Sequence, residues 1–318
     1  MNEVDHVESP HTPAEVAAAV RAFADGVKSA DPTLLVATPS LGGTPMDVDR
    51  ADRFLAALGP LLEDGTLDVL NLHSYHDTRP RKPHYSSLDP GPAWVPTRNF
   101  LRAKKAAGLT RPVTHAAGEF NYRNWDGTDD DRARGFMTAL WDQLMVVQNP
   151  GGPRCGLFSL PYELTDARPA PRQTVMAEAW AWRDDGTYDW APNEKGRVLR
   201  DQVAATRGMR FVACDPHGAG VAVLRGAGKT AWAWHNRPGY SPAAGADAVT
   251  VTGVPPATTQ LKVVTATTTA ADPARTVPTG GRAEVVITAP PAGQTLLILA
   301  DGEAADLPPG TVGRAAGT

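Results

Sequence analysis

The strongest constraint on the fold is a change in hydrophobic periodicity near Gly208. From Thr12 to about Ala205, short apolar runs of strand length alternate with patterns of helical spacing. After Gly208 apolar residues recur at every second position, in short β-branched runs separated by Gly, Pro and Asp. The connections in the first part favour right-handed crossovers between parallel strands. The sequence therefore predicts an α/β domain with a parallel sheet, followed by an antiparallel β domain.

The predicted elements have recognisable ends. The first helix begins after Thr12, with Pro13 in its first turn and Glu15 completing a capping box. Its inward face is predicted to contain Val16, Val20, Phe23 and Val27. Further helices are predicted at 48–63, 96–107, 129–147 and 194–205, with strands at 34–39, 67–75, 111–120 and 155–163. In the helix at 48–63 the inward face is predicted to contain Phe54, Leu55, Leu58, Leu61 and Leu62, and Gly65 stops the helix.

The second half predicts a small β-sandwich. Its strands are expected at 210–214, 220–226, 230–236, 248–254, 261–269, 283–289 and 295–301. Trp232 and Trp234 are expected to face opposite sides of one strand, in core packing rather than in a sugar-binding platform. We therefore expect three parts: a barrel-type domain at 1–207, a β-sandwich at 208–302 and a flexible tail at 303–318.

Composition excludes several classes of function. The chain has 318 residues and a formal net charge of -4, which supplies no basic field to attract nucleic acid. No run approaches the roughly 20 apolar residues of a membrane helix. Cys155 and Cys214 form neither a disulfide framework nor a metal cluster. We expect no cofactor, no metal, no nucleic-acid partner and no membrane partner.

The carboxyl ends of the predicted parallel strands are where a site is expected. Glu119 is the foremost candidate, because it directly follows the apolar run VTHAAG. Desolvation of a carboxylate at the end of such a strand is unfavourable, and a functional role would explain it. A capping or surface carboxylate is the alternative. His73, Ser74 and His76 also end a strand, but no third metal ligand and no G-x-S-x-G turn accompanies them. A polar cleft lining is therefore expected there. His115 is expected to be structural.

Three runs carry a resemblance to a known family. LDVLNLHSYHD at 67–77, RPVTHAAGEFNY at 111–122 and GLFSLPYELTD at 156–166 resemble the last three strands of a clan A glycoside hydrolase. The resemblance implies a (β/α)8 barrel and a retaining mechanism. It implies that Glu119 is the nucleophile at the end of the seventh strand. Tyr75 matches the tyrosine that commonly hydrogen-bonds that nucleophile.

Counting strands back from Glu119 gives the second carboxylate. The fourth strand of the clan ends in Asn-Glu, which matches Asn2 and Glu3. The resemblance implies that Glu3 is the acid/base and that Asn2 binds the sugar 2-hydroxyl. It also implies a partial barrel of strands four to eight, with strands one to three upstream of Met1. The chain is then expected to be a fragment of a longer protein, or to start at an internal methionine.

Retaining glycoside hydrolysis explains why two carboxylates are needed. One attacks the anomeric carbon, and the second, about 5 to 5.5 Å away, protonates the leaving oxygen. A glycoside, oligosaccharide or polysaccharide is the expected partner. The residues expected to line its cleft are His73, Tyr75, Trp94, Trp125 and Tyr162. The tryptophan that often ends the eighth strand of the clan is replaced here by FSLPYE.

Two questions stay open at the level of sequence. The alternative to an enzyme is a non-catalytic remnant that binds carbohydrate or serves a structural role. The localisation is also open, although enzymes of this resemblance are often secreted.

Overall fold

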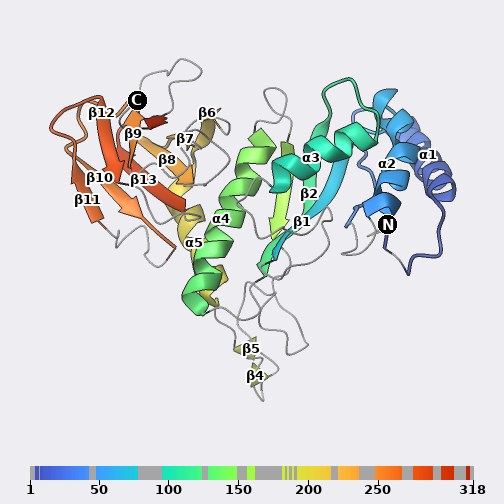
Figure 1. Ribbon diagram of the computed structural model, residues 1–318, viewed down its shortest axis with the longest axis horizontal. Helices are drawn as coiled ribbons and strands as arrows, with labels where there is room; N and C mark the ends of the chain where they lie inside the picture. Colours follow the sequence, from blue (N-terminus) through green and yellow to red (C-terminus); the bar gives the residue numbers. More distant parts are fainter. Residues whose placement is uncertain are drawn as a thin grey trace. The chain divides into compact units, whose positions relative to one another are not determined.

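The computed structural model (Figure 1) describes residues 4–6, 8–42, 48–77, 95–123, 128–148, 156–161, 181–182, 185, 188–189, 192–215, 221–235, 248–266, 275–288, 295–303 and 313–315. The chain divides into two compact units. The first unit comprises Met1–Arg123 and Val146–Tyr162, and the second comprises Asn124–Met145 and Glu163–Thr318. The chain therefore leaves the first unit after Arg123, returns to it at Val146 and leaves it again after Tyr162.

A parallel sheet forms the centre of the first unit. Its strands, in spatial order, are β1 (Val69–Asp77), β2 (Thr114–Arg123) and β3 (Gly156–Pro161). The segment 36–41 runs parallel to the free side of β1, to which it is joined by isolated bridges at Ala37 and Leu41. The N–H of Thr38 donates to the carbonyl oxygen of Val69 at 2.8 Å. Four parallel segments therefore follow one another in chain order, so their carboxyl ends share one edge.

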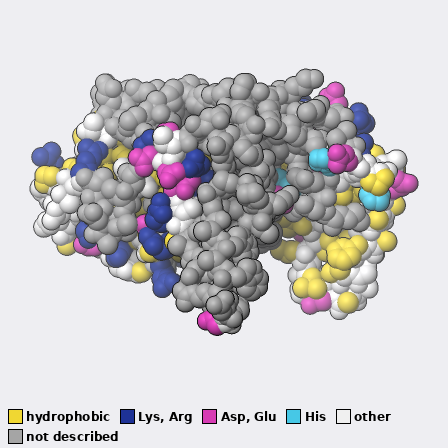
Figure 2. All heavy atoms as spheres, turned by 90° about the horizontal axis from the view of Figure 1, so that it is seen from below, with side chains coloured by type: hydrophobic (Ala, Val, Ile, Leu, Met, Phe, Trp, Pro, Cys, Tyr) yellow, Lys and Arg dark blue, Asp and Glu magenta, His cyan; other side chains and the backbone are white. Residues whose placement is uncertain are grey.

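The prediction of a strand at 34–39 needs correction. Pairing begins only at Val36 and extends to Leu41. The side chains of Leu34 and Leu35 are 50% and 58% exposed. The reason is a turn, in which the N–H of Leu34 donates to the carbonyl oxygen of Asp31 at 3.3 Å. Figure 2 shows hydrophobic side chains, drawn in yellow, on the surface of the molecule.

Three of the described helices belong to the first unit. They are α1 (Pro13–Ala30), α2 (Val48–Glu63) and α3 (Val95–Ala106). The capping box at the start of α1 is confirmed, since Thr12 Oγ1 accepts the N–H of Glu15 and the Glu15 carboxylate accepts the N–H of Thr12. Phe23, predicted to face inward, is 64% exposed. The buried stripe instead follows a spacing of four residues, through Val16, Val20 and Ala24, and Phe23 lies beside it.

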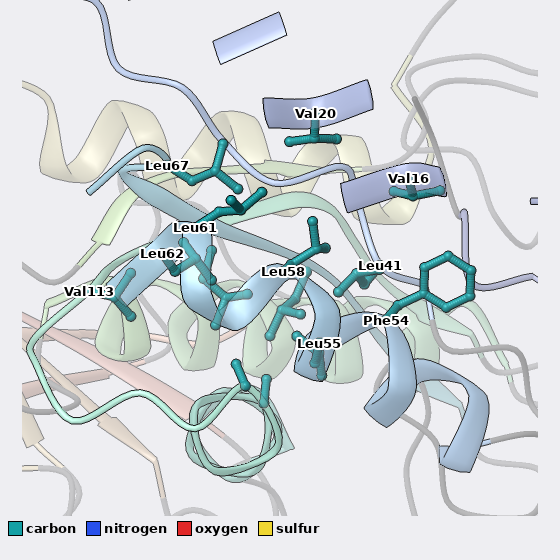
Figure 3. Packing of buried hydrophobic residues seen from close by; sticks show 14 of the residues in the cluster. Val16, Val20, Leu41, Phe54, Leu55, Leu58, Leu61, Leu62, Leu67 and Val113 are labelled. Atoms are coloured by element: carbon teal, nitrogen blue, oxygen red, sulfur yellow. The ribbon is translucent and has the colours of Figure 1, made fainter. Parts of the chain in front are cut away.

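The core of the first unit is centred on α2. All five residues predicted for its inward face are buried: Phe54, Leu55, Leu58, Leu61 and Leu62. Leu41, from the irregular segment beside β1, and Val113, just before β2, belong to the same cluster (Figure 3). Full burial of one such side chain contributes about 1.5 to 3 kcal/mol relative to exposure. Gly65, with φ of 81°, follows the helix end as predicted.

Among the residues that the structure describes, the second unit contains three antiparallel sheets and two helices. The helices are α4 (Asp129–Gln148), which reaches to Met145 within this unit, and α5 (Glu194–Thr206). The larger sheet has the order β11-β10-β13-β8-β7-β6, from Arg275–Pro278, Gln260–Val264, Thr295–Asp301, Lys229–His235, Val221–Gly226 and Arg210–Asp215. The smaller sheet has the order β12-β9-β14, from Glu284–Thr288, Ala248–Thr252 and Gly313–Ala315. A separate pair joins β4 (Ala181–Trp182) and β5 (Tyr188–Asp189).

Both larger sheets of this unit supply one core. Val251 and Ile287 from the smaller sheet cluster with Trp232, Trp234 and Ile298 from the larger one. The expectation that the two tryptophans face opposite sides is wrong, because residues two apart on a strand share a face. Both are buried, so the expectation of core packing is confirmed. Strands β11 and β14 were not predicted, and β14 falls within the tail that was expected to be flexible.

Helices α4 and α5 pack with the antiparallel strands. The indole Nε1–H of Trp141 donates to Gln202 Oε1 of α5 at 3.0 Å, and its ring meets Phe211 of β6 edge-on. Thr138 Oγ1 lies 3.3 Å from Thr295 Oγ1 of β13. The predicted domain boundary between residues 207 and 208 stays a prediction. Across the described helices, none is long and apolar enough to cross a membrane.

Candidate active site

A β-bulge in β2 precedes the candidate nucleophile. Leu72 of β1 pairs with Ala117 of β2, but the next residue, His73, pairs with Glu119. Gly118 is therefore the extra residue on β2. A glycine within an apolar strand is a typical sign of a bulge, and this signal was present in the sequence but was not used.

The bulge decides which way Glu119 points. In a regular strand, residues 115, 117 and 119 share a face. Here His115 pairs with Leu70. The centroid of its ring lies 4.8 Å from that of the Phe100 ring of α3, so this face is the one that α3 covers. After the bulge Glu119 is in register with His73 instead. The extra residue therefore turns the carboxylate away from the helix-covered face.

His115 is structural, as predicted. Its ring is fully buried, and Nδ1 lies 3.2 Å from the carbonyl oxygen of Leu70. Since a carbonyl oxygen only accepts, Nδ1 carries the proton. Burial lowers the pKa of His115 from 6.5 to about 4, and the hydrogen bond to Leu70 opposes that shift. His115 is therefore neutral near pH 7.

Two of the predicted site residues meet at the carboxyl edge of the sheet. His73 Nδ1 lies 3.4 Å from Glu119 Oε2. The side chain of His73 is 1% exposed, while that of Glu119 is 18% exposed. The imidazole is thus fixed inside the protein and the carboxylate retains access to solvent. This arrangement can orient a carboxylate toward a ligand outside the sheet.

The residues two positions after His73 and Glu119 are also in register. Tyr75 of β1 pairs with Asn121 of β2, although the side chain of Tyr75 lies outside the described part. Asn121 is buried, and its Oδ1 accepts the N–H of Tyr122 at 2.7 Å. Asn121 therefore adds a buried polar group, not selected from the sequence, to the edge that carries Glu119.

The bulge is filled by polar side chains that the sequence analysis did not select. Asn71 Oδ1 accepts the N–H of Gly118 at 2.8 Å, and Asn71 Nδ2 donates to Ser40 Oγ at 2.8 Å. Thr38 Oγ1 accepts the N–H of Asn71 at 2.9 Å. A signal was available, since an asparagine inside the apolar run LDVLNL has to satisfy its amide group in a buried strand.

The chain next to Asn2 and Glu3 is anchored at the same edge. Asp5 is buried, and its Oδ1 accepts the N–H of Gly42, which follows the segment paired with β1, at 3.1 Å. Arg50 of α2 donates from Nε to the carbonyl oxygen of Asp5 at 3.2 Å. Residues 4 and 5 are therefore held beside the carboxyl end of the segment 36–41.

The other predicted site residues lie outside the part of the chain that the structure describes. They are Asn2, Glu3, Trp94, Trp125 and Tyr162. Within the described part of the chain, no group of three His, Cys, Asp or Glu side chains could hold a metal ion. The described part of the site therefore consists of the His73–Glu119 pair and the groups that support it.

Solved structures with a similar fold are glycoside hydrolases. BuGH86 in complex with neoagarooctaose matches with a TM-score of 0.58 and 9% identity, over 95% of this chain and 49% of that one. A β-porphyranase of glycoside hydrolase family 86 from Bacteroides plebeius matches with a TM-score of 0.52 and 12% identity, over 96% and 56%. A monomeric β-xylosidase from Caulobacter crescentus matches with a TM-score of 0.50 and 14% identity, over 95% and 68%.

The chain shares the fold of these glycoside hydrolases. It spans about half the length of the two family 86 proteins. No protein-family model and no curated protein matches the sequence. Identities of this size show the fold alone.

Proposed function

We propose that this chain carries the catalytic site of a retaining glycoside hydrolase resembling clan A. Glu119 is the nucleophile and Glu3 is the acid/base. The observation that carries the proposal is the Glu119 carboxylate held at 3.4 Å by a buried His73, at the carboxyl edge of a parallel sheet. The fold shared with glycoside hydrolases supports the same reading.

The proposed reaction has two displacements. Glu119 attacks the anomeric carbon while Glu3 gives its proton to the leaving glycosidic oxygen, and a covalent glycosyl-enzyme forms. Glu3 then takes a proton from water, the water attacks the anomeric carbon, and Glu119 leaves with the bonding electron pair. His73 holds the Glu119 carboxylate in the attacking orientation. The anomeric configuration is retained, since each displacement inverts it once.

The four parallel segments are proposed to be strands five to eight of a (β/α)8 barrel. Their order, 36–41, β1, β2 and β3, supports this assignment, as does the anchoring of Asp5 beside Gly42. If the fourth strand ends at Glu3, residue 5 must lie next to the end of the fifth strand. The antiparallel sheets, which share one core, are proposed to be a β-sandwich.

The proposed substrate is a glycoside, oligosaccharide or polysaccharide. Asn2 is proposed to bind the sugar 2-hydroxyl, and Tyr75 to hydrogen-bond Glu119. Trp94, Trp125 and Tyr162 are proposed to cover sugar faces. The solved structure of BuGH86 contains neoagarooctaose, which makes agarose oligosaccharides one class to test.

Hydrolysis with a defined stereochemical outcome tests the proposal. The purified chain is incubated with nitrophenyl β-glycosides and with agarose, porphyran and xylan oligosaccharides, and the first-formed anomer is followed by proton NMR. We expect cleavage of at least one class with retention. Inversion would contradict the double displacement, and an absence of cleavage across the panel would contradict the enzyme.

A non-catalytic carbohydrate-binding or structural remnant is the alternative. It rests on the fold that the chain shares with glycoside hydrolases, because a fold does not by itself imply activity. Titration calorimetry with the same oligosaccharides separates the two proposals. Binding without hydrolysis supports the carbohydrate-binding remnant, whereas hydrolysis abolished by Glu119→Gln supports the enzyme.

A further inference from the structure

We propose that Asn71 is a positioning residue for Glu119, acting through the β-bulge at Gly118. This inference rests on the proposed function for its effect on catalysis, but its structural part does not. Asn71 lies on β1, two residues before His73, and its amide reaches across to the extra residue of β2.

The bulge creates a backbone donor that the strand ladder does not use. Between the pairs Leu72–Ala117 and His73–Glu119, the residue Gly118 has no partner in register on β1. Its N–H is taken by Asn71 Oδ1 at 2.8 Å. The contact is partly buried, and the loss of an acceptor costs about 1 to 3 kcal/mol for a fully buried N–H and less here, so the contact favours the bulged form over a regular strand.

A second contact fixes the orientation of the amide. Asn71 Nδ2 donates to Ser40 Oγ at 2.8 Å, so the oxygen must point at Gly118 and the nitrogen at Ser40. Ser40 lies in the segment on the other side of β1. The Asn71 side chain therefore ties together three neighbouring parallel segments at the level of the bulge.

The space beside Gly118 is matched to this amide. A Cβ placed on Gly118 would lie 2.9 Å from Asn71 Oδ1 and 3.1 Å from Asn71 Nδ2 and Ser40 Oγ. The glycine and the asparagine thus form a complementary pair. Their combined effect is the change of face between His115 and Glu119, without which the carboxylate would point toward the face covered by α3.

Three substitutions isolate this role. Asn71→Ala removes both side-chain contacts, the one with Gly118 and the one with Ser40, whereas Ser40→Ala removes only the contact that orients the amide. Thr38→Val is the matched control, because it removes the acceptor of the Asn71 N–H and leaves the side-chain amide intact. All three remove a hydrogen bond from the same part of the sheet, so a general loss of stability affects them alike.

The kinetic readout is the separation of kcat from KM on the best substrate of the panel. We expect Asn71→Ala to lower kcat about 100-fold, the size typical of a displacement of about 1 Å in a catalytic group, with KM nearly unchanged. Ser40→Ala should give a smaller decrease, and Thr38→Val should keep the wild-type kcat. Equal kcat values for wild type and Asn71→Ala would overturn the inference, as would an equal loss in Thr38→Val.

Crystal structures give a readout that needs no activity. In wild type we expect His73 Nδ1 and Glu119 Oε2 in contact, and in Asn71→Ala we expect this contact to be lost. If wild type hydrolyses nothing, the proposed function fails while this comparison still decides the role of Asn71. A bulge and a His73–Glu119 contact retained in Asn71→Ala would overturn it. If Asn71→Ala does not fold, the same comparison is made with Ser40→Ala.

Discussion

Two of the β-bulges among the described strands differ in their surroundings. In the first unit Gly118 is the extra residue between β1 and β2, and the Asn71 amide fills the space beside it. In the second unit Val212 is the extra residue between β6 and β7, and its side chain is 39% exposed. A bulge at the surface needs no internal partner, because water satisfies the displaced groups. The partner at Gly118 therefore marks a bulge that the protein maintains inside the sheet.

The two sheets also differ in what they bury. Strand β13 of the second unit is buried from Thr295 to Ala300 and contributes apolar side chains to its core. Strand β1 of the first unit instead buries His73 and holds Asn71 partly buried. Polar groups in a strand interior destabilise a fold unless they are bonded. The parallel sheet places such polar groups at the edge where Glu119 lies, and a local departure from apolar packing is typical of a functional site.

The largest expected effect follows from removing the charge of Glu119. Glu119→Gln should lower kcat roughly 10⁴-fold, as loss of a catalytic nucleophile or its partner does in other hydrolases. The thermal midpoint should change little, because the side chain is partly exposed. Steady-state kinetics on the best glycoside measures the effect. Asp25→Asn, on the exposed surface of α1, is the matched carboxylate control and should keep full activity.

Acid sensitivity of the first unit should come from His115. Its pKa is 6.5 when unfolded and about 4 when folded, so between these values the unfolded chain binds a proton that the folded chain does not. The stability associated with neutral His115 is complete above pH 6.5 and is lost as pH falls to about 4. The loss should amount to about 3 kcal/mol.

Urea unfolding at pH 7, 5.5 and 4 measures this loss. His115→Asn keeps an N–H donor near the Nδ1 position but does not titrate, so its stability should fall less between pH 7 and pH 4 than that of wild type. The difference between the two pH dependences of stability removes the contribution of the carboxylates, which both proteins share. Parallel pH dependences for the two proteins would show that His115 is not the group responsible.

Changing the side chain of the extra residue in each bulge tests their difference directly. Gly118→Ala places a Cβ 2.9 Å from Asn71 Oδ1, so the amide must move and Glu119 loses its orientation. We expect kcat to fall about 100-fold, which corresponds to a rise of about 2.7 kcal/mol in the activation free energy. Val212→Ala, at the exposed bulge, should leave kcat unchanged. Similar kcat values for both variants would remove the distinction between the two bulges.

The smallest effect concerns the second unit alone. Trp141→Phe removes the Nε1–H that donates to Gln202 and leaves a buried acceptor without its donor. The free energy of unfolding should fall by about 2 kcal/mol. Because no catalytic group is involved, kcat should stay at the wild-type value. Denaturant unfolding and an activity assay on the same sample measure both quantities, and a parallel loss of kcat would contradict the assignment of catalysis to the first unit.

Periodic features were predictable from the sequence. The helix α2 matches its predicted bounds and its five buried residues, because a strong amphipathic pattern ends at Gly65. The capping box of α1 is likewise a local pattern with a local cause. Glu119 and His73 could be selected because polar residues that end apolar strands are conspicuous, and they do lie together.

Other features depend on contacts between distant segments and escaped prediction. Leu34 and Leu35 are as apolar as a buried strand, but a turn after α1 exposes them. The register shift at Gly118 depends on Asn71 and Ser40, which are far from it in sequence. Strand β14 exists only through its pairing with β9. The positions of Glu3 and of the predicted aromatic residues stay predictions.

The central claim is that Glu119 forms the covalent intermediate, and trapping tests it most directly. The chain is incubated with dinitrophenyl 2-deoxy-2-fluoroglycosides of the sugar it cleaves, digested, and sequenced by mass spectrometry. The account predicts one added fluoroglycosyl group on Glu119 and none in Glu119→Gln. An adduct on another carboxylate, or turnover of the natural glycoside without any trapped intermediate, would contradict it.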